Sequence, residues 1–228
     1  MSALRHIPNA LTCANLVCGC MGIICLFTNK IEPAYFIWAA CVFDFFDGFA
    51  ARLFKVSSPI GKELDSLADM VSFGVLPALA LYTWISTGTT NQYLPFIAIF
   101  TAVFSALRLA KFNIDENQSD SFIGVPTPAN ALFISALPFL PESLQAWVFL
   151  PVSLIAITLV FSFLLVAPLK LFALKFKHFG WAGNQIRFTF LGISVLLLVM
   201  FYAGAIPFII LFYIGISLGW RLAGVETN

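Results

Sequence analysis

Charged side chains are scarce in this sequence. Only 10% of the 228 residues are Asp, Glu, Lys or Arg, whereas 61% are hydrophobic. A water-soluble domain carries roughly 25% charged residues to cover its surface, so this composition excludes an ordinary soluble fold. The formal net charge is only +1, which gives no indication of a strongly basic face for nucleic acid. Most of the surface is therefore expected to face lipid, and we predict no nucleic-acid partner.

Cysteine usage does not support a disulfide framework. The five cysteines all lie in the first two apolar segments, their number is odd, and their spacing is not that of paired metal ligands. We interpret them as small apolar packing residues. The first apolar segment is interpreted as a retained helix rather than a signal peptide, because one apolar span after another follows it.

Long apolar runs recur along the whole chain. A helix needs about 20 apolar residues to cross a hydrocarbon layer about 30 Å thick. We predict eight spans, at about 10–28, 33–54, 62–86, 93–113, 126–141, 144–167, 187–203 and 205–222. No soluble domain or internal repeat is apparent. The predicted fold is an all-α integral membrane protein, a polytopic helix bundle of about eight transmembrane helices that forms a single membrane domain over residues 1–228.

The distribution of Lys and Arg predicts an orientation. Cytoplasmic ends of membrane spans carry an excess of these residues. With a cytoplasmic N-terminus and eight spans, eleven of the twelve Lys and Arg residues fall at cytoplasmic ends and only Lys30 falls outside. Both termini are then cytoplasmic. A basic stretch at 169–178 either lies on the lipid surface or is a loop that sets the topology.

Two of the predicted spans carry acidic residues. Asp44 and Asp47 are three residues apart in the second span, and Asp65 and Asp69 are four apart in the third. Such spacings put each pair on one helix face. An ionisable residue inside a span costs at least about 2.5 kcal/mol on insertion scales and indicates a functional site by default. The connection between the two spans is short, so the four carboxylates are expected to face one another near the cytoplasmic surface.

Four carboxylates in a site of low dielectric need counter-charge. Arg52 and Lys62 offset only part of it. Hard divalent cations with oxygen ligands supply the remainder, and Mg²⁺ or Mn²⁺ shared with substrate phosphates fits best. Two such ions can hold a phosphoryl group for in-line displacement. The alternative for the aspartates is that they form buried ion pairs with nearby Lys and Arg. The alternative for Gly48 and Gly61 is that they are ordinary glycines at helix-packing contacts.

The segment from Asp44 to Asp69 resembles the signature of the CDP-alcohol phosphotransferases, D-x2-D-G-x2-A-R-x8-G-x3-D-x3-D. Every fixed position is present. The resemblance implies a six-helix catalytic core, about 1–167, followed by a two-helix extension, about 168–228. It implies that Asp44, Asp47 and Asp65 are metal ligands, and that Asp69 both faces the metal site and serves as general base. It further implies a CDP site lined by Asn9, Thr12, Asn15, Gly48, Ala51, Arg52 and Gly61. The alternative for the polar residues of the first span is that they tie helices together.

Two downstream segments resemble those of the phosphatidylserine synthase branch, R-L-A-R-F-N and F-x-G-L-P-x-P-A-A-A. They run from Arg108 to Asn113 and from Phe122 to Asn130, with Lys111, Val125 and Asn130 as departures. The resemblance implies L-serine as acceptor of a phosphatidyl group from CDP-diacylglycerol. Arg108 and Lys111 suit the serine carboxylate, unless they are only charges that set topology. The predicted serine-binding residues are Arg108, Lys111, Asn113, Thr127 and Asn130.

The predicted reaction is direct displacement that gives phosphatidylserine and CMP. Another acceptor, such as glycerol 3-phosphate or inositol, is the alternative within the family. A cation transporter with intramembrane acids is the alternative from another class. The family resemblance also implies that the protein forms a homodimer. Membrane lipids are expected to be its other partners. We expect the protein in a bacterial inner membrane, with the active site toward the cytoplasm.

Overall fold

Helices account for most of the chain in the computed structural model, which describes residues 6–28, 32–56, 58–114, 121–172 and 184–222. The N-terminal half holds α1 (Ile7–Thr28), α2 (Pro33–Leu53), α3 (Pro59–Asp69), a π-helical turn (Met70–Val75), α4 (Leu76–Gly88), a 3-10 turn (Leu94–Ala98) and α5 (Ile99–Ile114). The remainder holds β1 (Ser121–Ile123), α6 (Thr127–Ser135), a 3-10 turn (Leu137–Phe139), α7 (Glu142–Val148), α8 (Pro151–Val166), β2 (Lys170–Phe172), α9 (Gln185–Phe201), a 3-10 turn (Tyr202–Ala205) and α10 (Ile206–Leu222).

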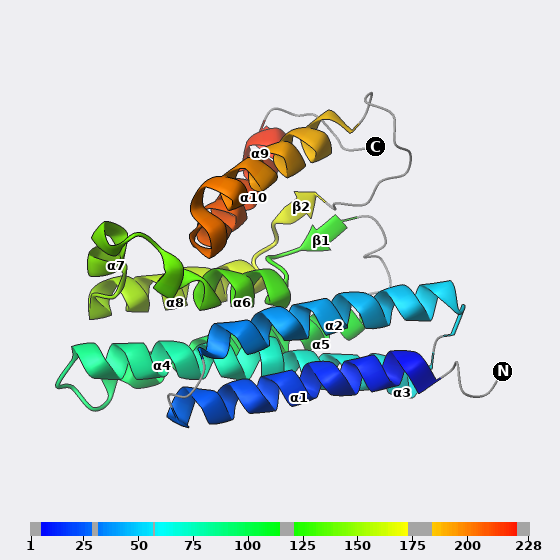
Figure 1. Ribbon diagram of the computed structural model, residues 1–228, viewed down its shortest axis with the longest axis horizontal. Coiled ribbons are helices and arrows are strands. Elements are labelled where there is room, and N and C mark those ends of the chain that lie inside the picture. Colours follow the sequence, from blue (N-terminus) through cyan, green and yellow to red (C-terminus); the bar gives the residue numbers. More distant parts are fainter. Residues whose placement is uncertain (1–5, 29–31, 57, 115–120, 173–183, 223–228) are drawn as a thin grey trace.

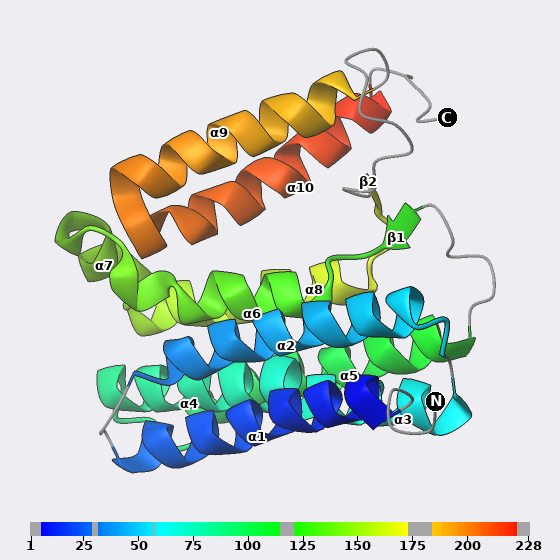
Figure 2. The same ribbon diagram turned by 45° about the vertical axis from the view of Figure 1, so that its right-hand side comes forward.

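The helices form three layers (Figures 1 and 2). α1, α2, the helix running from α3 to α4, and α5 lie side by side in the first layer. α6 and α8 cover this layer, with α6 against α2 and α8 against α5. α9 and α10 form a hairpin that packs on α6 through α10. The predicted all-α, polytopic bundle is confirmed.

The third predicted span is one long helix with an irregularity inside it. Residues Pro59–Gly88 form one 30-residue helix that is apolar enough to cross a membrane, although its first three turns carry charged side chains. Ser58 starts it: its hydroxyl accepts a hydrogen bond from the Gly61 N–H at 3.0 Å, and Pro59 occupies the first turn, where a missing N–H costs nothing. The π-helical turn begins at Met70, directly after Asp69. Such turns are rare and occur frequently at functional sites.

The fifth and sixth predicted spans differ from the observed helices. Residues 126–141 form only the short α6 and a 3-10 turn, and the chain then bends by 119° into α7. Residues 144–167 form α7 and α8 rather than one helix. Pro151 explains the break, because it holds the preceding Leu150 in an extended conformation (ψ 136°). α8 has 16 residues and is about 24 Å long, shorter than the hydrocarbon layer.

The seventh and eighth predicted spans correspond to α9 and α10. The two helices are separated by the turn at Tyr202, which has positive φ (50°). By length and hydropathy, five stretches of the described residues can cross a membrane, with α9 and α10 counted as one, and the bent α6–α7 pair makes a sixth.

A small antiparallel ladder, which the sequence did not predict, joins β1 and β2. Phe122 lies opposite Leu171. Gly124 follows β1 with φ of +76°, and a Cβ there would collide with the Leu165 carbonyl, so only glycine fits. The ladder occupies part of the predicted basic stretch at 169–178, and residues 173–178 of that stretch lie outside the described residues.

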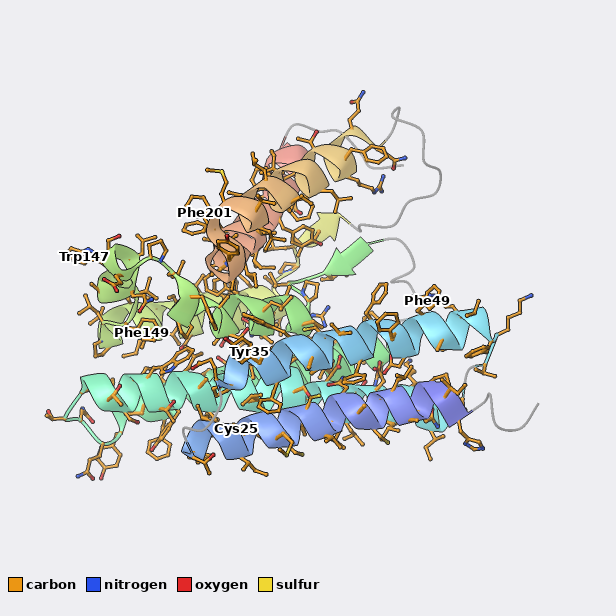
Figure 3. All side chains as sticks on the ribbon, viewed as in Figure 1. Cys25, Tyr35, Phe49, Trp147, Phe149 and Phe201 are labelled. Atoms are coloured by element: carbon orange, nitrogen blue, oxygen red, sulfur yellow. The ribbon has the colours of Figure 1, made fainter. Side chains whose placement is uncertain are left out.

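Apolar side chains cover much of the outer surface. Phe45, Val199 and Trp147 expose 62%, 68% and 70% of their surface, as a lipid-facing surface requires. Trp147 and Phe201 project outward at the end of the bundle opposite Phe49 (Figure 3), where aromatic rings suit the interface between lipid and water. Inside, Phe133 of α6 stacks on Phe161 of α8 with ring centres 4.0 Å apart. The protein is an integral membrane protein.

Candidate active site

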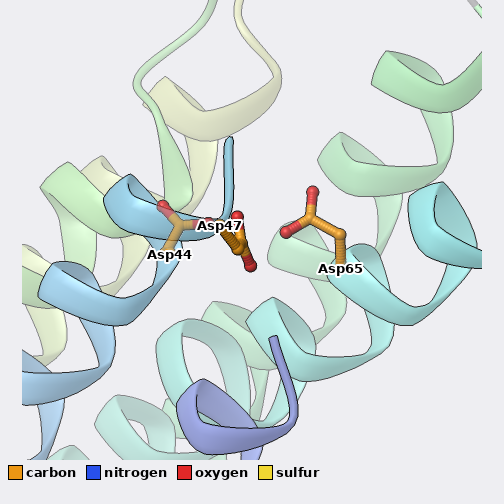
Figure 4. Close-up of side chains that lie close together, drawn as sticks. All are labelled: Asp44, Asp47 and Asp65. Carbon is orange, nitrogen blue, oxygen red and sulfur yellow. The ribbon is translucent and has the colours of Figure 1, made fainter. Parts of the chain in front are cut away.

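Three carboxylates from two helices converge near one end of the first layer. Asp44 and Asp47 lie one turn apart on α2, and Asp65 faces them from α3 (Figure 4). One oxygen from each carboxylate lies within 4.8 Å of the others. Asp47 is buried, and Asp44 and Asp65 are half-buried. The structure thus brings together three of the four aspartates that the sequence predicts at the metal site.

Asp69 stands one turn farther along α3 and is not part of this close group. It is buried, with 7% of its surface exposed, and its carboxyl is a neighbour of the Asp44 carboxyl. Asn15 of α1 donates a hydrogen bond from Nδ2 to Asp69 Oδ1 at 3.0 Å. Thr12, one turn earlier on α1, donates to Asp47 Oδ2 at 2.7 Å. α1 therefore holds one carboxylate from each of the other two helices.

A cavity of about 610 Å³ opens beside the carboxylates. Asp47 and Asp65 lie on its wall, as do five of the seven residues predicted to bind CDP: Asn9, Thr12, Gly48, Ala51 and Gly61. Gly48 has only the Arg52 guanidinium within 4 Å of the position of a Cβ, so its missing side chain leaves room in the cavity. Asn15 is fully buried and is not on the cavity wall.

Two of the cations near the site have other partners. The Lys62 ammonium donates to the Asn113 carbonyl at 2.6 Å, and Arg108 donates to Thr127 Oγ1 at 3.3 Å. Arg52 is exposed beside Gly48. In the described part of the chain, no Lys or Arg is paired with the four aspartates. The structure therefore does not support the alternative of buried ion pairs.

The carboxylates meet the requirements of a divalent metal site. Asp65 Oδ1 is buried without a hydrogen-bond partner, although a buried polar atom normally has one. Asp44, Asp47 and Asp65 offer only oxygen ligands, which Mg²⁺ and Mn²⁺ prefer. The donor set and the unpaired oxygen fit such an ion.

A second cavity, of about 510 Å³, lies between α5, β1 and the end of α8. Arg108 and Lys111 are on its wall. Arg108 is also close enough to Asp69 to interact with it electrostatically. Its Nε is buried without a partner. A buried guanidinium with a free donor beside a cavity is suited to bind an anionic group.

The other three residues predicted to bind serine are placed differently. Thr127 is buried next to Arg108. Asn113 donates from Nδ2 to Ser66 Oγ of α3 at 2.9 Å, so its amide is already engaged. Asn130 is fully buried, and neither polar atom of its amide has a hydrogen-bond partner. The structure thus groups Arg108, Lys111 and Thr127, and leaves Asn113 at the α3–α5 contact.

Several cavity residues are absent from the predicted set. Pro8, Lys55, Val56, Ser58 and Lys62 also line the larger cavity. Lys55 follows α2 with positive φ (52°), and its N–H bonds to the Arg52 carbonyl. The short connection between α2 and α3 was the available signal, because it must pass the mouth of any site between the two helices.

Comparison with known proteins agrees with this geometry. Residues 5–200 match the family described as CDP-alcohol phosphatidyltransferase. A Bacillus subtilis protein named CDP-diacylglycerol–serine O-phosphatidyltransferase is 36% identical over 181 residues, which cover 77% of this chain and 92% of that protein. Proteins of the same name from Helicobacter pylori and Methanocaldococcus jannaschii are 38% and 35% identical, over 59% and 56% of this chain and 57% and 58% of their own length. The chain belongs to the CDP-alcohol phosphatidyltransferase family.

Proposed function

We propose that this protein transfers the phosphatidyl group of CDP-diacylglycerol to the hydroxyl of L-serine, giving phosphatidylserine and CMP. The convergence of Asp44, Asp47 and Asp65 beside a cavity lined by the signature glycines carries the proposal. The names of the relatives support serine as the acceptor. The protein is accordingly a transferase of phospholipid synthesis.

The larger cavity is the proposed site for CDP. Asn9, Thr12, Gly48, Ala51 and Gly61 are on its wall, and Arg52 beside Gly48 offers a guanidinium for phosphate oxygens. The apolar surface of the bundle faces the bilayer, where the acyl chains lie. CDP-diacylglycerol thus keeps its polar part in the cavity and its chains in lipid.

The aspartates are the proposed metal ligands. Asp44, Asp47 and Asp65, with Asp69 next to them, would hold two Mg²⁺ or Mn²⁺ ions. When bound, these ions neutralise charge on the pyrophosphate and on the departing CMP. The carboxylates keep their places through α1, because Thr12 bonds to Asp47 and Asn15 bonds to Asp69.

Asp69 is the proposed general base. It takes the proton from the serine hydroxyl as the hydroxyl oxygen attacks the phosphorus that bears diacylglycerol. The new bond joins this oxygen to phosphorus, and the bond from phosphorus to the CMP oxygen breaks. Arg108, with Lys111 and Thr127, binds the serine carboxylate on the side of the smaller cavity. Asn113 and Asn130 were predicted for the same pocket and stay proposals.

The deciding experiment measures CMP release from CDP-diacylglycerol in purified protein. L-Serine, glycerol 3-phosphate and inositol are added separately, with and without a chelator. We expect release with serine, its loss with chelator, and its recovery with Mg²⁺ or Mn²⁺. Release with another alcohol alone would reject serine. Absence of CMP with every alcohol, together with ion flux, would favour the transporter.

The setting of the enzyme is also part of the proposal. Both termini and the active site face the cytoplasm, in a bacterial inner membrane. Residues 1–167 form the catalytic core, and residues 168–228 form an extension that packs on it. Leu171, Phe190 and Tyr213 of this extension belong to the same buried apolar cluster as Phe133 and Phe161. The assembly is a homodimer.

A further inference from the structure

Helix α1 carries two polar side chains one turn apart that make parallel contacts. Thr12 donates to Asp47 of α2, and Asn15 donates to Asp69 of α3. Their surroundings differ. Thr12 lies on the wall of the larger cavity, so it can also contact a nucleotide. Asn15 exposes 0% of its surface and lies behind that wall.

The burial of Asn15 limits what its side chain can do. Its Oδ1 has no hydrogen-bond partner, and an unpaired buried polar atom carries a free-energy cost. The compensating contact is the bond from Nδ2 to Asp69, which is strengthened when the acceptor is a carboxylate. The bond ends on Asp69, the aspartate that lies beside the close group of Asp44, Asp47 and Asp65 rather than within it.

The backbone around this contact is locked. Ser72, in the π-helical turn that follows Asp69, donates from Oγ to the Asn15 carbonyl at 3.0 Å. Gly19, one turn farther along α1, is so close to Ser72 that a Cβ would collide with the Ser72 hydroxyl. α1 therefore contacts this helix at Asp69 itself, through the Asn15 side chain, and again three residues later, where the Ser72 hydroxyl bonds to the Asn15 carbonyl. This double contact defines where the Asp69 carboxylate lies.

We propose that Asn15 is a positioning residue for Asp69, rather than a residue that binds the nucleotide. It fixes one oxygen of the Asp69 carboxylate, so that the other remains available to the acceptor hydroxyl. This inference rests on the proposed role of Asp69 as general base. It separates the two polar residues of α1: Thr12 serves the metal and nucleotide side, and Asn15 serves the base.

The test compares Asn15→Ala and Asn15→Gln with Thr28→Val. Thr28 is an exposed residue on the same helix whose hydroxyl bonds only to carbonyls of its own last turn, so its variant is the matched control. We expect Asn15→Ala to lower kcat about 10- to 100-fold, because a general base contributes about 10²- to 10⁴-fold and is misplaced rather than removed. The KM for CDP-diacylglycerol and its equilibrium Kd, measured with purified protein in detergent, stay within about twofold of wild type.

Asn15→Gln keeps the amide donor, and we expect it to recover part of kcat. If the alanine variant is not recovered as folded protein, Asn15→Leu, which keeps the branched shape of the side chain without a donor, is measured in its place. A rise of about tenfold or more in the Kd for CDP-diacylglycerol with kcat retained would overturn the inference and return Asn15 to the nucleotide site. Unchanged kcat would also overturn it.

The experiment distinguishes failure of the proposed function from failure of the inference about Asn15. The wild-type protein must first release CMP with an alcohol, and the comparison of variants can use whichever alcohol supports release. If serine fails and another alcohol works, the proposed acceptor is wrong while the role of Asn15 is still tested. If wild type releases CMP with serine and Asn15→Ala does so at the same rate, only the present inference fails.

Discussion

Asp69 differs from the other three aspartates in its partners. It is bonded to Asn15, lies near Arg108, and stands outside the close group of Asp44, Asp47 and Asp65. We expect Asp69→Asn to lower kcat by about 10²-fold or more, the range in which general bases contribute. Binding of CDP-diacylglycerol is expected to persist, as equilibrium titration of the purified variant can check. Turnover equal to wild type would remove Asp69 as the base.

Arg108 and Arg52 lie near different cavities, so their substitution is expected to affect different substrates. Arg108 is buried beside the smaller cavity, whereas Arg52 is exposed next to Gly48, which lines the larger one. Because an arginine binds an anionic group through its planar fork, Arg108→Ala is expected to raise the KM for serine by about tenfold, or about 1.4 kcal/mol. Arg52→Ala is expected to raise the KM for CDP-diacylglycerol instead. Initial rates at varied concentrations of each substrate measure both effects, and equal shifts of both constants in the Arg108 variant would contradict this assignment.

At the scale of elements, the contact between α1 and the π-helical turn decides the shape of the site. A Cβ on Gly19 would collide with Ser72, whereas one on Gly192 of α9 would meet nothing within 4 Å. We expect Gly19→Ala to force the two helices apart and to lower both thermal stability and kcat, because packed interiors tolerate added volume poorly. Gly192→Ala is the control and is expected to keep both, since alanine favours a helix. Thermal unfolding in detergent and CMP release check the pair. Equal behaviour of the two variants would show that the α1 contact is not required.

Helix ends differ in how directly they follow from the sequence. Periodic apolar runs located α1, α2, the α3–α4 helix and α5 to within a few residues. The stretch around Pro138, Pro141 and Pro151 was harder, because proline is compatible both with a kinked span and with a chain reversal. Packing against neighbouring helices decides whether such a segment continues as a kinked span or reverses its direction. The same holds for the π-helical turn at Met70, for which the sequence offers no pattern.

At the scale of the whole molecule, the cations occupy one end. Arg52, Lys55, Lys62, Arg108 and Lys111 lie at the ends of α2, α3 and α5 that adjoin the carboxylates. Lys and Arg are retained on the cytoplasmic side of a membrane. We therefore expect a reporter enzyme that works only in the cytoplasm to be active when fused to either terminus, and a reporter that works only outside the cytoplasm to be inactive. A terminus that reports the other side would reverse the proposed orientation of the active site.

The sequence by itself determined the membrane class and the positions of the four aspartates in the spans, and its resemblance to a known family indicated the reaction. Apolar runs and helical spacing are local properties that do not depend on tertiary contacts. Only the tertiary structure decided which partners these side chains have. It separated Asp69 from the other aspartates, placed Asn15 on Asp69 behind the cavity wall, and engaged Asn113 with Ser66. A hydrogen bond between residues about 50 positions apart depends on how helices pack and rotate against one another, and no local pattern records that rotation.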